Sequence, residues 1–341
     1  MKNFVEDPCL PTTPQHERNF FMAMYVSHLI GGETLLSKVI KAGTIRGYLK
    51  EAAALCEPRG IMNPLIGIDG KKSPWIEDMI AEHKRWEQMP NRQEPVTLEM
   101  LKYINKLAKK EPKDSLLASM RDWLCLGNYA GFRLQEWAQE KKNTKNGGFA
   151  VWEKSEGGDG SAKAFLCEDF TFFGKRSKVI TSSAKKVIHA KDTETMKLRY
   201  RYQKNGDNGQ KVAYAKNPEN PDFCPIVAGT NIRKRAQRLG VEKDTPIAVY
   251  KNDKGSYSHI TEKDIERILQ MAAKEVHNIT NRRDLMRFSS HSIRVGAAVT
   301  LHICGKDGEY IKLRLRWRSD TFRLYLRNAD IMLISGIKET I

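Results

Sequence analysis

The spacing of apolar residues divides the chain into a helical first region and a longer mixed region. Apolar residues that recur every three or four positions predict helices over about 17–29, 44–56 and 75–87. Residues 1–16 contain several prolines and predict an extended lead-in. The polar stretch 89–97 also contains prolines, so we expect the domain boundary there.

Capping residues indicate where several helices should begin. A side-chain oxygen at such a position can accept a hydrogen bond from the first helical turn. The candidates are Thr44, Thr97, Asp114, Thr261 and Ser290. The helix after Asp114 should end at Gly131, the helix after Ser290 should end at Gly305, and the chain after Gly229 is mostly of helical pattern.

Alternation of apolar and polar residues predicts a small antiparallel sheet in the middle of the chain. Segment 141–163 is rich in glycine and typical of a loop, and strand candidates follow at 164–173 and 178–181. The clearest hairpin joins 196–204 to 210–216 through Asn-Gly turn residues. In its first strand, apolar Leu198, Tyr200 and Tyr202 alternate with Arg199 and Arg201. The predicted fold class is therefore mainly α with a small antiparallel β-sheet (α+β).

Charge points to a nucleic-acid partner. The 341 residues include 58 Lys and Arg against 41 Asp and Glu, a formal net charge of +17. The six cysteines are scattered without a C-x-x-C pair, which argues against a zinc site or a disulfide scaffold. No signal peptide or membrane-spanning run stands out, so we expect a soluble, intracellular protein with no membrane partner.

The segment 289–328 contains the most informative motif. His291 and Arg294 lie three positions apart, which places them on one face of a helix. After Gly305 come Trp317 and, eight positions later, Tyr325. This order resembles the C-terminal signature of the tyrosine recombinase and integrase family: H-x-x-R, a glycine, His or Trp, and then tyrosine. The wording RWRSDTFRLYLRN is similar to the Crypton- and DIRS-type recombinases of mobile elements.

The resemblance extends to the rest of the chain. In GFRLQEW, Arg133 follows a glycine where the family has its first arginine, with Glu136 nearby. The family's hairpin lysine matches Lys204, with Lys211 as the alternative. Residues 17–90 are similar to a helical core-binding (SAM-like) DNA-binding domain, and residues 97–341 to the catalytic domain.

The resemblance implies a site-specific recombinase or integrase that cuts and rejoins double-stranded DNA for a mobile element. The reaction would pass through a 3′-phosphotyrosine, which retains the bond energy, so no cofactor, no metal and no small-molecule substrate are expected. The implied catalytic residues are Arg133, Lys204, His291, Arg294, Trp317 and the nucleophile Tyr325. The resemblance also implies self-association, as a dimer on each site and a tetramer on DNA. The location would be the nucleus in a eukaryotic host and the cytoplasm or nucleoid otherwise.

The residue types suit displacement at a phosphodiester. Guanidinium groups are always charged and fork onto two oxygens, so Arg133 and Arg294 can stabilise charge in the transition state. An unperturbed tyrosine titrates near pH ~10, so Tyr325 needs help from His291 to lose its proton. Lys204 is the candidate general acid for the leaving 5′-oxygen. The Trp317 indole can donate one hydrogen bond to the phosphate.

Two alternatives remain open from the sequence. A type IB topoisomerase would share this chemistry but would relax supercoiled DNA as a monomer. A catalytically inactive remnant of a transposon would bind DNA without cutting it.

Overall fold

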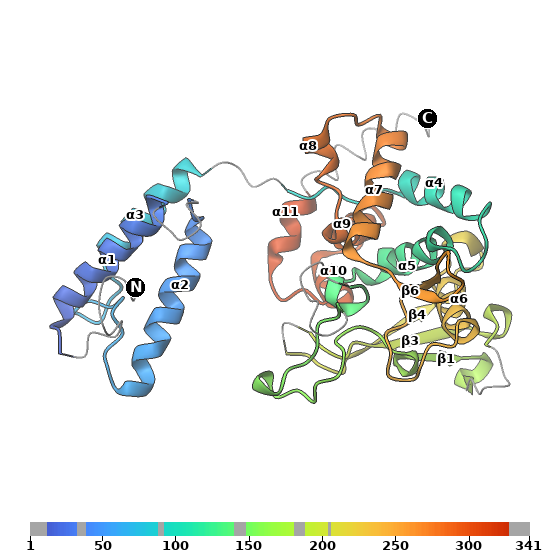
Figure 1. Ribbon diagram of the computed structural model, residues 1–341, viewed down its shortest axis with the longest axis horizontal. Helices are drawn as coiled ribbons and strands as arrows, with labels where there is room; N and C mark the ends of the chain where they lie inside the picture. The colour runs from blue at the N-terminus through green and yellow to red at the C-terminus, as the bar shows by residue number, and fades with distance from the viewer. Residues whose placement is uncertain are drawn as a thin grey trace. The chain divides into compact units, whose positions relative to one another are not determined.

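The computed structural model describes residues 12–32, 39–87, 92–139, 148–180, 188–203 and 206–326. The chain divides into two compact units, Met1–Pro90 and Asn91–Ile341. Both are built mainly of helices, and the second also contains a small antiparallel sheet (Figure 1). The predicted fold class is therefore confirmed. In the described part of the chain, no helix is long and apolar enough to cross a membrane.

In the described part of the first unit, three α-helices form a bundle: α1 (Gln15–Ile30), α2 (Ala42–Cys56) and α3 (Pro74–Trp86). Its core is made of apolar residues from all three, namely Met22, Ala23, Val26, Leu29, Ala42, Ile45, Leu49, Ile76 and Ile80. The prediction that Thr44 caps α2 is wrong, because the helix begins two residues earlier with Lys41 at the N-cap. The Glu87 carboxylate accepts the Ala42 N–H instead, which satisfies a free donor of the first turn.

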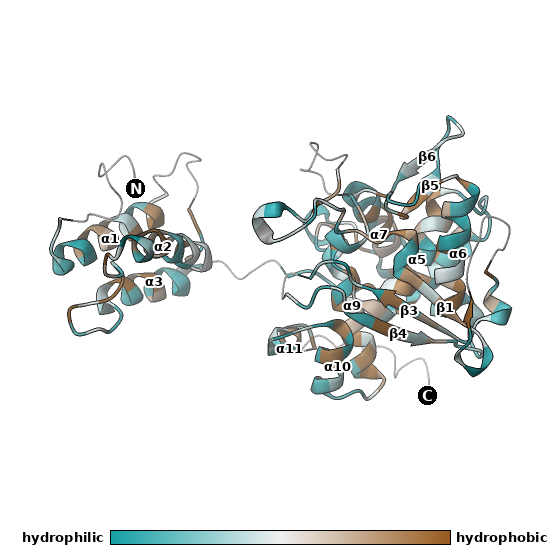
Figure 2. Cartoon of the chain, turned by 90° about the horizontal axis from the view of Figure 1, so that it is seen from below, coloured by the Kyte–Doolittle hydropathy of each residue, from teal (hydrophilic) through white to brown (hydrophobic). Residues whose placement is uncertain are grey.

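The second unit contains the remaining helices. They are α4 (Leu98–Ala108), α5 (Leu116–Ala130), α6 (Pro225–Arg238), α7 (Glu262–His277), α8 (Arg282–Leu285), α9 (Ser290–Ile303), α10 (Gly308–Leu315) and α11 (Arg323–Leu326). Thr97 and Thr261 cap α4 and α7 as predicted, each accepting a hydrogen bond from the N–H three residues later. Figure 2 shows hydrophobic positions gathered towards the interior of this unit and hydrophilic ones over its outer loops.

Two predicted caps in the second unit are wrong by one residue. Ser115 rather than Asp114 caps α5, because the Asp114 carboxylate instead accepts from Arg238 at 3.1 Å. Ser289 rather than Ser290 caps α9, where its hydroxyl accepts the N–H of His291. His291 is therefore the second residue of α9, in its first turn.

The sheet has the strand order β2-β1-β3-β4. Its strands are β1 (Phe170–Phe173), β2 (Val179–Ile180), β3 (Thr195–Arg199) and β4 (Lys211–Ala215). The β3–β4 hairpin is confirmed, with Leu198 opposite Val212. The strand ends at Arg199, however, so the predicted alternation as far as Tyr202 is wrong. A second hairpin, β5 (Val249–Lys251) with β6 (Tyr257–His259), lies in the region predicted as mostly helical.

Close packing brings the start of α9 against the segment that enters the second unit. A Cβ on Gly296 would lie 2.5 Å from the Val96 carbonyl oxygen, so only glycine allows this approach. Val96 N–H also donates to the Ser292 carbonyl at 3.1 Å. The helix that carries His291 and Arg294 is thus held at a fixed place on the core of this unit.

Candidate active site

The first turn of α9 presents His291 and Arg294 from one face of the helix. Ser289 caps the turn, and its hydroxyl also takes part in a capping box with Ser292. His291 is exposed, whereas Arg294 is only 4% exposed. On this face of the helix, His291 therefore lies at the surface and Arg294 lies in the interior.

Tyr325 lies directly against His291. The distance between His291 Nε2 and the Tyr325 hydroxyl is 3.0 Å, and the ring centroids are 5.7 Å apart. Tyr325 belongs to the short helix α11 and packs with Val295 and Val299 of α9. A tyrosine hydroxyl within hydrogen-bond reach of an imidazole is the arrangement required of a nucleophile and its base.

Arg133 reaches the same place from the end of α5. Gly131 ends that helix in the left-handed conformation, with φ of 56°, and its carbonyl accepts from Arg294 Nη1 at 2.7 Å. Arg133 Nη2 and Arg294 Nη2 both donate to the carbonyl oxygen of Arg316, each at 3.4 Å. Two guanidinium groups from distant parts of the sequence therefore converge on one acceptor.

Trp317 closes the group of side chains. The Arg294 guanidinium lies over its ring, 4.4 Å from the centroid, and the ring centroid of Tyr325 is 5.9 Å away at 64°. The indole N–H is buried and has no hydrogen-bond partner among the described residues. A buried donor without an acceptor destabilises the folded protein. An anion bound here would accept a hydrogen bond from the indole N–H and remove that cost.

The electrostatics of the site favour an anion. Burial, together with the neighbouring Arg133, lowers the pKa of Arg294 to about 9, which leaves the guanidinium charged at neutral pH. Although His291 keeps contact with solvent, the protein atoms packed around its imidazole, together with Arg294 and Arg133, lower the pKa of His291 below its usual value. His291 is therefore neutral near pH 7 and can accept a proton.

Lys204 lies outside the described residues. Gln203 and the residues 206–210, which are described, lie between β3 and β4. Gln203 N–H donates to the Asn208 side chain at 2.7 Å. Asp207 accepts from Arg318, the residue after Trp317, at 3.0 Å. The described part of the chain between β3 and β4 therefore touches the segment that carries Trp317.

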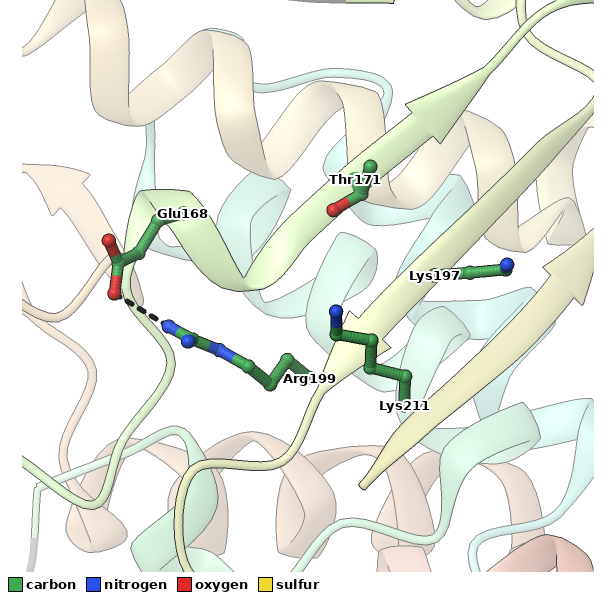
Figure 3. Close-up of a pocket in the computed structure, with 5 residues that line it drawn as sticks. All are labelled: Glu168, Thr171, Lys197, Arg199 and Lys211. Atoms are coloured by element: carbon green, nitrogen blue, oxygen red, sulfur yellow. Dashed lines mark hydrogen bonds and ion pairs between the residues drawn. The ribbon is translucent and has the colours of Figure 1, made fainter. Parts of the chain in front are cut away.

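Lys211, the alternative lysine, lies on the face of the sheet opposite to the one that carries Tyr214. Figure 3 shows it at a cavity of about 160 Å³, whose lining residues are Glu168, Thr171, Lys197, Arg199 and Lys211. Successive residues of a strand face opposite sides of the sheet, so Lys211 and Tyr214 lie on different faces of β4. The Tyr214 ring contacts Arg314 of α10, 4.2 Å from its centroid. Lys211 therefore faces away from that helix, which leads directly to Trp317.

One residue at the centre of the site is absent from the predicted set. Arg316 has a fully buried side chain that pairs with Glu136 at 2.9 Å. Burial alone would lower the pKa of Arg316, but Glu136 and the nearby tyrosines raise it. Sequence analysis missed its burial, because the run KLRLRWR offers three arginines with no means of telling which one points inward.

Comparison with known proteins gives only distant likenesses. No protein-family model and no curated protein matches the chain. The XerH site-specific recombinase bound to difH substrate, in a pre-cleavage complex, is 14% identical with a TM-score of 0.43, over 90% of this chain and 66% of that chain. Its post-cleavage complex is 14% identical with a TM-score of 0.45, over 94% and 71% of the two chains.

A third solved structure is that of the Tn1549 transposon integrase in complex with transposon right end DNA. It is 9% identical with a TM-score of 0.47, over 90% of this chain and 80% of that chain. Because all these TM-scores lie below 0.5, the function has to be inferred from the residues of the site. The similarity to Crypton- and DIRS-type sequences stays a prediction.

Proposed function

We propose that this chain is a site-specific DNA recombinase or integrase of a mobile element, which cleaves and rejoins DNA through a 3′-phosphotyrosine. The supporting observation is the 3.0 Å contact between His291 Nε2 and the Tyr325 hydroxyl, next to two arginines that share one acceptor. The site therefore combines a nucleophile, a base and stabilisers of phosphate charge.

In the proposed cleavage step, the Tyr325 oxygen forms a bond to phosphorus and the bond from phosphorus to the 5′-oxygen breaks. His291 accepts the tyrosine proton, and Lys204 supplies a proton to the leaving oxygen. Rejoining is the reverse, in which a 5′-hydroxyl attacks the phosphotyrosine. Because the bond energy is kept, the cycle needs no ATP.

Arg133 and Arg294 act on the non-bridging oxygens of the phosphate. Both are already fixed by hydrogen bonds before DNA arrives, so little reorganisation is needed when charge develops. Trp317 offers its N–H as one further donor. Lys204 is assigned the acid because Asp207, three positions later in the sequence, accepts a hydrogen bond from Arg318, the residue after Trp317.

DNA is the proposed partner, and the formal net charge of +17 supports this. We assign DNA contacts to the helical first unit and the chemistry to the second. Assembly as a dimer on each site and a tetramer on two sites completes the proposal.

The test is a covalent adduct between the protein and DNA from the ends of its own element. The wild type is expected to form a band that resists detergent and heat but yields to protease, and the band should also form in excess chelator. Tyr325→Phe should abolish it, because one oxygen is lost with almost no change in volume. Tyr310→Phe is the matched control, since Tyr310 is a 43% exposed residue of α10 and should leave the adduct unchanged.

Three results would redirect the assignment. An adduct that still forms in Tyr325→Phe would show that Tyr325 is not the nucleophile. Relaxation of a supercoiled plasmid that lacks any element sequence would favour the topoisomerase alternative. A wild type that forms no adduct on any end sequence would favour the inactive remnant.

A further inference from the structure

Arg316 has an unusual backbone for a residue with a long side chain. It follows α10 and ends that helix in the left-handed conformation, with φ of 59°. L-residues other than glycine and asparagine rarely adopt this conformation. A residue held there in spite of the steric cost indicates that the surrounding contacts impose it.

The side chain of Arg316 is anchored on both sides. Its Nη2 donates to Glu136 Oε2 at 2.9 Å, and its Nη1 donates to the Ala130 carbonyl at 2.9 Å. The guanidinium also lies over the Tyr200 ring, 3.5 Å from the centroid. Its partners therefore come from the end of α5, from the turn that follows Arg133 and from the chain after β3.

The carbonyl of the same residue is the acceptor that both site arginines share. Arg133 and Arg294 each donate to it at 3.4 Å. Glu136, the partner of the Arg316 side chain, also accepts from the Arg133 N–H at 2.9 Å and from Arg133 Nη1 at 3.1 Å. One buried residue thus ties the two guanidinium groups together, through its backbone on one side and its side chain on the other.

We propose that Arg316 is a positioning residue, which holds Arg133 and Arg294 at the spacing that receives the non-bridging oxygens of the phosphate. This inference rests on the proposed function, and it adds a residue that touches neither DNA nor the nucleophile. Arg316 acts through the two arginines, so its loss should impair charge stabilisation rather than attack by Tyr325.

The experiment replaces Arg316 by glycine and compares two DNA substrates. Glycine accepts the left-handed backbone, so the variant keeps the end of α10 while losing the anchor. One substrate has an ordinary phosphodiester at the cleavage point, and the other has a methylphosphonate, in which a methyl group replaces one non-bridging oxygen and removes its charge. The neutral linkage needs less help from the arginines.

On the phosphodiester, Arg316→Gly should form adduct about 10²–10³-fold more slowly than the wild type, as when one preorganised donor is lost, because Arg133 and Arg294 are no longer held in place. On the methylphosphonate, the two proteins should differ by less than about tenfold. Arg316→Lys keeps a positive charge for Glu136, so its rate of adduct formation on the phosphodiester should lie between those of the wild type and Arg316→Gly. Equal losses on both substrates would overturn the proposal and leave Arg316 a purely structural residue.

Arg314→Ala is the matched control. Arg314 belongs to the same basic run and donates to the Ala213 carbonyl at 2.6 Å, so its loss removes the same charge and a contact to the same hairpin. Its ratio of rates on the two substrates should equal that of the wild type. A shift as large as that of Arg316→Gly would mean that the effect comes from net charge.

A measurement without DNA separates this inference from the proposed function. In nuclear magnetic resonance spectra, the guanidinium protons of Arg133 and Arg294 should be resolved in the wild type, because their hydrogen bonds restrict rotation. In Arg316→Gly they should broaden or exchange faster, whereas Arg314→Ala should leave them unchanged. Unchanged signals in the glycine variant would refute the positioning role, whether or not the protein cuts DNA.

Discussion

Two arginine clusters in the described part of the second unit differ in how their charge is balanced. In the scaffold cluster, Arg235 of α6 is 2% exposed and pairs with the equally buried Asp122 of α5 at 2.6 Å. It also donates to the Ser119 hydroxyl and to the Lys113 carbonyl. Every nitrogen of that guanidinium therefore has an acceptor within the protein.

The site cluster contains three arginines and one carboxylate, which contacts only two of them. Glu136 contacts Arg133 and Arg316, whereas Arg294 donates to the carbonyl oxygens of Gly131 and Arg316. The buried charge of Arg294 is thus solvated by dipoles and sits beside a like charge. The scaffold cluster is complete in the free protein, whereas the site cluster has positive charge to offer to an anion.

The largest expected effect is a loss of stability when the central arginine of the scaffold cluster is replaced. Arg235→Met should lower the free energy of unfolding by about 3 kcal/mol, because it removes one of the two arginines, Arg235 and Arg121, that pair with the buried Asp122 carboxylate. Urea titration of the wild type and the variant measures this. Arg238→Ala, on the exposed side of the same helix, should cost at most about 1 kcal/mol. Similar losses for both variants would contradict the distinction.

The same substitution in the site cluster should act on the reaction instead. Arg294→Met keeps most of the volume and removes a buried charge that has no carboxylate of its own, so the free energy of unfolding should change little. Adduct formation should slow by about 10²–10³-fold, because a preorganised donor to the transition state is lost. DNA affinity, measured on the uncut substrate, should change far less. A loss of stability as large as that of Arg235→Met would show that Arg294 has a structural role like that of Arg235.

The contrast also shows what the sequence could predict. Helical spacing placed His291 and Arg294 on one face of a helix, and alternation located the β3–β4 hairpin, because both depend on local periodicity. The role of Arg316 depends on Glu136, 180 positions away, and no local pattern encodes that pairing. The second hairpin was missed because its strands, Val249–Lys251 and Tyr257–His259, are too short to show alternation.

Acidic pH should lower the stability of the folded protein through His259, which lies outside both clusters. Burial lowers its pKa to about 4, against about 6.5 in the unfolded chain. As the pH falls below 6.5, the unfolded chain takes up a proton that the folded protein refuses until about pH 4, so stability is lost across this window. The loss at pH 5 should be about 2 kcal/mol. Urea titrations at pH 7.5 and pH 5 measure it, and His259→Phe should show a smaller loss between the two.

The smallest expected effect tests directly whether the site cluster is open to an anion. Inorganic phosphate bound between Arg133 and Arg294 would stabilise the folded protein by about 1.4 kcal/mol at ten times its dissociation constant. The negative charge would also offset the two arginines, which lower the pKa of His291. That pKa should therefore rise when phosphate binds, whereas the pKa of His259, lowered by burial alone, should stay the same.

Nuclear magnetic resonance titration of the two imidazoles, His291 and His259, in the presence and absence of phosphate measures these pKa values. Arg294→Met should lose both responses and Arg238→Ala should keep them. Equal shifts at both histidines would instead indicate a general salt effect, and the two clusters would then differ in their contacts but not in their capacity to bind an anion.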